Sequence, residues 1–139
     1  MAGDIGALCG AMEECYEFML SYAGQGLAGD QGAQIRDHLE RASRALSELP
    51  ECYSQILAQD NLEPAEPYRA FGSVLAADAR NALAAVELVL AQKSISSQLI
   101  DNLNASIHLR SLLTDLFLID EILKTRHSAS SHRQPPATV

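Results

Sequence analysis

The chain has 139 residues, of which 47% are hydrophobic, so it can form one folded domain with its own core and is not expected to be disordered. Its net charge of −8 disfavours nucleic acids and anionic membranes as partners, because such a surface repels phosphate groups. No apolar run reaches the roughly 18 residues of a membrane-spanning helix. The three cysteines have no metal-binding spacing and no signal segment is evident, so we expect a cytoplasmic protein with reduced thiols.

The first predicted helix begins after Asp4, which can serve as its N-cap. Apolar residues then recur at intervals of three and four residues, the spacing of one helix face: Ile5, Leu8, Cys9, Met12, Cys15, Met19 and Tyr22. Glycines between residues 24 and 32 end this helix. Because they follow no predicted strand, we interpret them as an inter-helix loop and not as a phosphate-binding loop.

The second predicted helix begins near Asp30 and contains Pro50 in its interior. A proline there removes one backbone hydrogen bond and crowds the carbonyl of Leu46, which predicts a kink or a break. The apolar spacing continues in phase after the proline, which favours a kink. Two further prolines, Pro64 and Pro67, rule out helix until about Pro67. The apolar stripe comprises Ile35, Leu39, Ala42, Leu46, Leu49, Tyr53 and Ile56.

The third predicted helix runs from Pro67, at its first position, to about Gln92 and is rich in alanine. The fourth begins with Ser94 or Ser96 as its N-cap and runs to about Arg126. Short connections join the four helices, so we predict an all-α fold with an up-down-up-down antiparallel four-helix bundle. Residues 1–126 would form this single domain, and residues 127–139 would be a flexible tail.

The fourth predicted helix carries more apolar residues than one face can hold. Its first half has an apolar arc around Leu99 and Leu103, and its second half has an arc displaced by more than roughly a third of a turn. Five residues of the second arc follow a heptad-like spacing and are predicted to form a homodimer seam. The alternative is that both arcs belong to the core of one chain. The predicted seam residues are Leu109, Leu112, Leu116, Ile119 and Leu123.

Catalytic chemistry has little support in the sequence. Cys9 and Cys15 fall on an apolar stripe without a base beside them, and no Glu-x-x-His motif exists. We therefore predict no catalytic residue, no metal site and no cofactor, and do not expect an enzyme. The polar residues Asp78, Arg80 and Asn81 interrupt the Ala-rich helix and either line a pocket or lie on an exposed face.

His38 and His108 lie within predicted helices. The segment DHLERA, with Arg41 and Ala42 close to His38, resembles the phosphate-accepting segment of histidine phosphotransfer domains. The Lys-Gly pair that those domains carry after the histidine is missing. A phosphotransfer module therefore stays an alternative, as does a helical bundle that binds a small ligand.

The remaining features favour an interaction protein. We predict a regulatory homodimer that binds a partner protein through a helix face, the partner carrying a basic or amphipathic segment. In size and charge the chain is similar to small acidic helical dimers among secretion chaperones and antiactivators.

Overall fold

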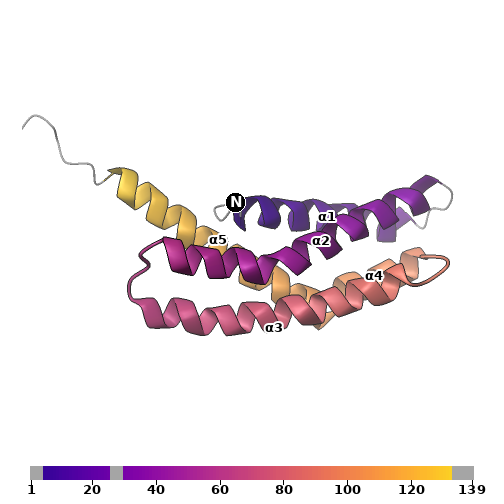
Figure 1. Ribbon diagram of the computed structural model, residues 1–139. Helices are drawn as coiled ribbons and strands as arrows, with labels where there is room; N and C mark the ends of the chain where they lie inside the picture. Colours follow the sequence, from indigo (N-terminus) through magenta and orange to yellow (C-terminus); the bar gives the residue numbers. More distant parts are fainter. Residues whose placement is uncertain (1–4, 26–29, 133–139) are drawn as a thin grey trace, which may run out of the picture.

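The structure, a computed structural model, describes residues 5–25 and 30–132, with side chains for 5–24 and 33–126. These residues form five helices and no strand (Figure 1): α1 (Ile5–Gln25), α2 (Asp30–Gln59), α3 (Ala65–Leu90), α4 (Ser97–Ala105) and α5 (Ile107–His132). The predicted all-α class is confirmed. The helix count is five instead of four, and the up-down-up-down four-helix topology stays a prediction.

Helices α1 and α2 have bounds close to those expected from the sequence, and the second begins at Asp30 as predicted. The apolar stripe of α1 is buried except for Leu8, which is half-buried. The predicted N-cap, Asp4, and loop residues 26–29 lie outside the described residues. Spacing of apolar residues at three and four positions was therefore a sufficient guide to both helices.

Pro50 lies inside α2 without breaking it. The helix changes direction between its two halves (Figure 1). Leu49 and Tyr53, on either side of the proline, are both buried in the core. An interior proline costs about 3 kcal/mol, whereas full burial of each large apolar side chain contributes roughly 1.5–3 kcal/mol. Packing on both sides therefore outweighs the lost hydrogen bond.

Helix α3 begins at Ala65, two residues before the predicted start at Pro67. Its N-cap is Pro64, with extended backbone angles (φ −73°, ψ 141°). Pro67 then falls in the first turn, where backbone N–H groups have no acceptor within the helix. The missing N–H of Pro67 therefore costs nothing, and the prediction that prolines exclude helix before Pro67 was wrong.

The single helix predicted from Ser94 or Ser96 to about Arg126 is divided at Ser106, which has extended backbone angles (φ −61°, ψ 136°). The Ser106 side-chain oxygen accepts hydrogen bonds from the N–H groups of His108 (3.1 Å) and Leu109 (3.4 Å). Ser106 thus ends α4 and caps α5. The displaced apolar arc of the sequence is explained by this break, because the two halves are separate helices with different axes.

The other end of α4 follows the prediction. The Ser96 hydroxyl accepts a hydrogen bond from the N–H of Leu99 (3.0 Å), so Ser96 is the N-cap. Helix α5 continues to His132, beyond the end expected near Arg126. Of the predicted tail, residues 127–132 are helical and residues 133–139 lie outside the described part of the chain.

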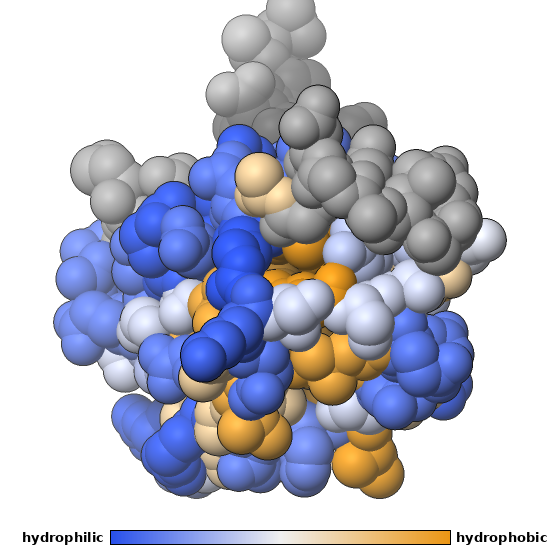
Figure 2. Space-filling model, turned by 90° about the vertical axis from the view of Figure 1, so that its right-hand side faces the viewer, coloured by the Kyte–Doolittle hydropathy of each residue, from blue (hydrophilic) through white to orange (hydrophobic). Residues whose placement is uncertain are grey.

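The buried residues of all five helices form one hydrophobic cluster. Helix α2 packs against α1 and α3, α3 against α5, and α1 against both α4 and α5. The Tyr22 hydroxyl donates to the carbonyl oxygen of Ile95 (2.6 Å), and Arg36 donates to those of Leu90 (3.0 Å) and Gln92. These bonds attach the α3–α4 connection to α1 and α2. Seen from one end, the outline is mostly hydrophilic and hydrophobic residues show between the polar ones (Figure 2).

The five predicted dimer residues, Leu109, Leu112, Leu116, Ile119 and Leu123, are all buried within the single chain. They belong to the hydrophobic cluster shared by the five helices. Their placement therefore agrees with the alternative interpretation, in which this arc belongs to the core of one chain. A dimer would need another surface, because side chains already covered by α1 and α3 have little area left to bury. Across the described residues, none of the helices has the length and hydropathy needed to cross a membrane.

Candidate functional site, an apolar groove between helices α3 and α5

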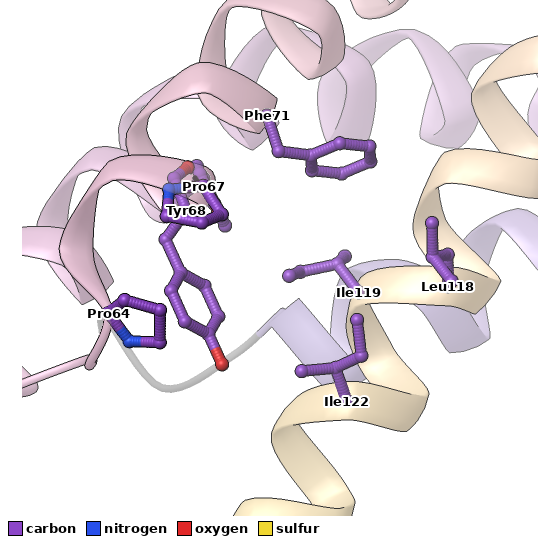
Figure 3. A pocket seen from close by; sticks show the side chains of 8 residues that line it. Pro64, Pro67, Tyr68, Phe71, Leu118, Ile119 and Ile122 are labelled. Carbon is purple, nitrogen blue, oxygen red and sulfur yellow. Dashed lines mark hydrogen bonds between the residues drawn. The ribbon is translucent and has the colours of Figure 1, made fainter.

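A groove lies between the start of α3 and the second half of α5 (Figure 3). Its volume is about 350 Å³, and its lining is almost entirely apolar. The close-up view shows side chains of the two helices pointing toward one another across the open space. The lining residues are Tyr53, Pro64, Pro67, Tyr68, Phe71, Leu118, Ile119 and Ile122.

Tyr53 of α2 holds the inner side of the groove in place. Its hydroxyl donates to the backbone carbonyl of Tyr68 (2.7 Å), and its ring meets that of Phe71 edge-on with centroids 6.5 Å apart. Burial, together with Tyr68, raises the pKa of Tyr53 to about 12, so the hydroxyl keeps its proton at neutral pH. A Cβ atom on Gly72 would lie 3.2 Å from the Tyr53 ring. Glycine at position 72 thus permits the close approach of α3 to this ring.

The α5 wall of the groove is partly open to solvent. Ile119 is buried at its base, whereas Leu118 is 52% exposed and Ile122 is 37% exposed. Val74 of α3 and Phe117 of α5 are also exposed large apolar residues on these two helices. Partly exposed apolar side chains beside an apolar groove are typical of a binding surface.

Two carboxyl groups, Asp78 of α3 and Asp115 of α5, meet between the same two helices. Burial, hydrogen bonding to Asp78 and repulsion from its charge raise the pKa of Asp115 to about 7. A hydrogen bond between two carboxyl groups requires a proton on one of them. Asp115 Oδ2 is buried and accepts no hydrogen bond from another described residue. With a pKa near neutrality, the Asp115 carboxyl is only partly ionised at neutral pH.

No charged residue lines the groove, and several lie next to its lining residues in the sequence. Glu66 forms an ion pair with Arg69 (3.0 Å), and both are exposed. Glu63, just before α3, and Glu121, within α5, are also exposed. The rim is therefore more acidic than basic, in keeping with the net charge of −8.

A second, smaller cavity of about 190 Å³ lies near the start of α1. Lys124 and Asp120, which line it, form an ion pair (3.1 Å). The residues lining this cavity are Ile5, Gly6, Ile56, Asp60, Asp120, Leu123 and Lys124. Its cation is already paired with Asp120, and the cavity is smaller than the groove.

The histidines and cysteines considered in the sequence lie apart from the groove. His38 stacks on Phe18 with ring centroids 4.2 Å apart, whereas His108 is exposed in the first turn of α5. Burial raises the pKa of Cys15 to about 12, and burial with nearby carboxylates raises that of Cys9 to about 11. Both are therefore protonated thiols at neutral pH and poor nucleophiles. In the part of the chain that is described, no group of three or more His, Cys, Asp or Glu could hold a metal ion.

Sequence reasoning missed the groove because its walls come from distant segments. In the sequence, Leu118 and Ile122 lie outside both apolar arcs of the fourth predicted helix, and this is the one signal that points to them. Tyr68 and Phe71 lie within the third predicted helix and are partly buried. For Asp78 the sequence allowed two interpretations, a pocket-lining residue or a residue on an exposed face. The structure places it close to Asp115.

Comparison with known proteins found no matching family model, curated protein or solved structure for this chain.

Proposed function

We propose that this protein is a non-enzymatic interaction module that binds a partner protein by taking up apolar side chains in the groove between α3 and α5. The observation that carries the proposal is the partial exposure of Leu118 and Ile122 beside a cavity of about 350 Å³. Burial of their remaining exposed area would contribute about 2 kcal/mol, before the partner's own burial is added. The exposed apolar surface is thus a source of binding energy.

The shape of the site favours a helical partner segment. A groove between two packed helices accepts an amphipathic helix whose apolar residues recur at three- and four-residue intervals. The volume corresponds to roughly a dozen water molecules, at about 30 Å³ each, which is room for one aromatic or two aliphatic side chains. The module would act as an adaptor or sequestering protein, and we further propose a cytoplasmic location.

Two other occupants define the competing functions. A second copy of the chain would give the homodimer predicted from the sequence, but each copy carries a charge of −8, which opposes self-association. A small apolar ligand is the second candidate, because the groove volume falls within the range of roughly 300–1,000 Å³ for ligand pockets. A phosphotransfer role would instead use the exposed His108, which does not line the groove, and would not account for the groove.

The test is capture of partners from an extract of cells that make the protein, using immobilised wild-type protein and two variants. Leu118→Glu places a charge in the groove. Leu88→Glu, at a site on α3 that is 67% exposed, is the matched control. We expect a protein bound by the wild type and by the Leu88 variant but lost from the Leu118 variant. Equal capture by all three would contradict the proposal.

The oligomeric state is measured in parallel by analytical ultracentrifugation. A dimer that becomes a monomer on Leu118→Glu substitution would show that the groove binds a second copy. A monomer at tens of micromolar would remove the dimer from consideration. Extraction of bound small molecules from the purified protein, followed by mass spectrometry, distinguishes the ligand-binding alternative.

A further inference from the structure

Helix α3 has a side that faces solvent along most of its length. The helix lies at the lower edge of the bundle in Figure 1, and its core side carries the buried residues Leu75, Ala79, Ala82, Val86 and Val89. On the opposite side, residues recur at alternating intervals of three and four positions, which is the heptad spacing of a coiled-coil seam. These six residues, which include the C-cap Ala91, form the outer stripe of α3: Val74, Ala77, Asn81, Ala84, Leu88 and Ala91.

The outer stripe combines exposure to solvent with an absence of charge. Val74 is 47% exposed and Leu88 is 67% exposed, whereas Ala77 is half-buried and the remaining three residues are exposed. A helix side that is turned toward water normally carries charged residues. An exposed side without them is typical of a surface that packs against another chain. The charged residues of α3 all lie off the outer stripe: Glu66, Arg69, Asp78, Arg80 and Glu87.

The residues of the outer stripe alternate between larger and small side chains. Val74, Asn81 and Leu88 are seven residues apart, and an alanine follows each of them after three residues. Two copies of this stripe fit together when the helices run antiparallel, because each larger side chain then lies opposite an alanine of the other copy. In a parallel pair each residue would face its own equivalent, and the alanine layers would leave gaps. The stripe is thus complementary to itself in the antiparallel arrangement.

Two charged residues beside the outer stripe, Arg80 and Glu87, are complementary to those of a second copy. Both are exposed, and neither takes part in the ion pairs of the described residues. Each precedes a stripe residue by one position, so both lie on the same flank, and a two-fold axis between antiparallel helices brings this flank of the two copies together. In the register that sets Asn81 opposite Ala84 of the second copy, Arg80 comes within about 3 Å of the level of the second copy's Glu87 along the helix axis. The oppositely charged pair then forms twice.

The other antiparallel register that sets larger residues against alanines is less favourable. It places Asn81 opposite Ala77 of the second copy and brings the two Arg80 side chains together, so that like charges meet. In the favoured register the two Asn81 residues lie on neighbouring layers at the two-fold axis, where their amides can bond to one another. A single asparagine in such a seam fixes the alignment of the helices. Charge and hydrogen bonding therefore select the same register.

We propose that the outer stripe of α3 is the contact surface of an antiparallel two-fold homodimer, with Arg80 of each copy beside Glu87 of the other. None of the six stripe residues lines the groove, so this inference does not depend on the proposed function. The net charge of −8 opposes such a contact only weakly. Helix α3 contributes three acidic and two basic residues to it, and charges beyond about 8 Å are screened at physiological ionic strength.

The experiment measures association of the full-length protein by sedimentation equilibrium at physiological ionic strength, over about 1–100 µM. Leu88→Glu places a charge in the outer stripe, and Leu20→Glu makes the same change at a residue of α1 that is 49% exposed. We expect a dimer for the wild type and the Leu20 variant, and a monomer of unchanged helicity for the Leu88 variant. If Leu88→Glu loses helicity in circular dichroism, Ala84→Glu, at an exposed alanine of the stripe, provides the same test.

Reversal of the flanking charges tests the orientation and the register. Arg80→Glu and Glu87→Arg should each weaken the dimer roughly tenfold, because each change brings like charges together twice. The double variant exchanges the two charges and should restore the affinity of the wild type. In a parallel dimer, or in another register, the two positions do not meet and the second change would restore nothing.

The outcomes separate this inference from the proposed function. A wild type that stays monomeric over the whole concentration range would overturn the inference. So would a dimer that survives Leu88→Glu, or one whose affinity the double charge reversal does not restore. A dimer that is lost on Leu118→Glu but retained on Leu88→Glu would place the second copy in the groove instead. Capture of a partner by the Leu88 variant but not by the Leu118 variant concerns the groove alone, so either proposal can fail without the other.

Discussion

Replacement of Asp115 by asparagine should stabilise the protein at neutral and alkaline pH. The pKa of Asp115 is raised from 3.8 to about 7 by burial and by its neighbour Asp78. Asparagine has nearly the same size but carries no charge, and its amide can donate to Asp78 where the protonated carboxyl now does. The substitution therefore removes an ionisation that the folded state opposes.

The sign of the effect follows from proton binding. Between about pH 4 and pH 7 the folded state holds a proton that the unfolded chain has lost, so wild-type stability falls as pH rises through this range. Above about pH 7 the loss is complete. The pKa difference sets an upper limit of about 4 kcal/mol, and solvent screening at this interhelix site reduces it to about 1–2 kcal/mol.

The assay is urea denaturation followed by far-ultraviolet circular dichroism, at about pH 4 and about pH 8. Asp115→Asn should exceed the wild type by about 1–2 kcal/mol at the higher pH and equal it at the lower one. The control is Asp101→Asn, an exposed carboxylate on α4, which should show neither effect. An Asp115→Asn protein less stable than the wild type at about pH 8 would refute the reasoning, since the carboxylate would then be stabilising.

Three further substitutions, with their controls, test the packing. Leu116→Glu should unfold the protein, seen as lost helicity, because a charge would replace a fully buried side chain. The control Leu88→Glu, on an exposed site, should stay folded, and a folded Leu116 variant would contradict the core assignment. Gly72→Ala should lower the melting temperature because of overpacking against the ring on the groove floor, whereas Gly10→Ala, with open space around its Cβ, should raise stability by about 0.5–1 kcal/mol. Ser106→Ala should cost about 1 kcal/mol in urea denaturation by removing the cap of α5; an unchanged midpoint would show that the cap is dispensable.

Helix positions and helix caps depend on residues a few positions apart in the sequence, and these features were predictable from the sequence. The apolar spacing in α1 and α2 identified both helices, since residues three and four positions apart lie on one helix face whatever packs against it. The sequence offered Ser94 or Ser96 as a cap, and the structure shows Ser96; such a cap is predictable because its hydroxyl bonds an N–H three residues on, which is a local interaction. The in-phase stripe around Pro50 likewise indicated that α2 would continue.

Other properties depended on what lies beside each helix. The sequence showed two apolar arcs in residues 97–126, but a continuous helix and two helices capped at Ser106 have the same composition. Whether the arc from Leu109 to Leu123 faces a second copy or the chain's own core depends on where α1 and α3 pack. Burial is a relation between elements, and periodicity alone does not specify the partner.

The candidate site was decided entirely by tertiary structure. Its walls lie about fifty residues apart in sequence, around Tyr68 and Ile122, and the register of α3 against α5 brings them together. The same register sets Asp78 against Asp115. Each of these residues is ordinary on its own helix. The groove and the raised pKa of Asp115 exist only because packing removes water between the two helices and leaves a gap where their side chains do not meet.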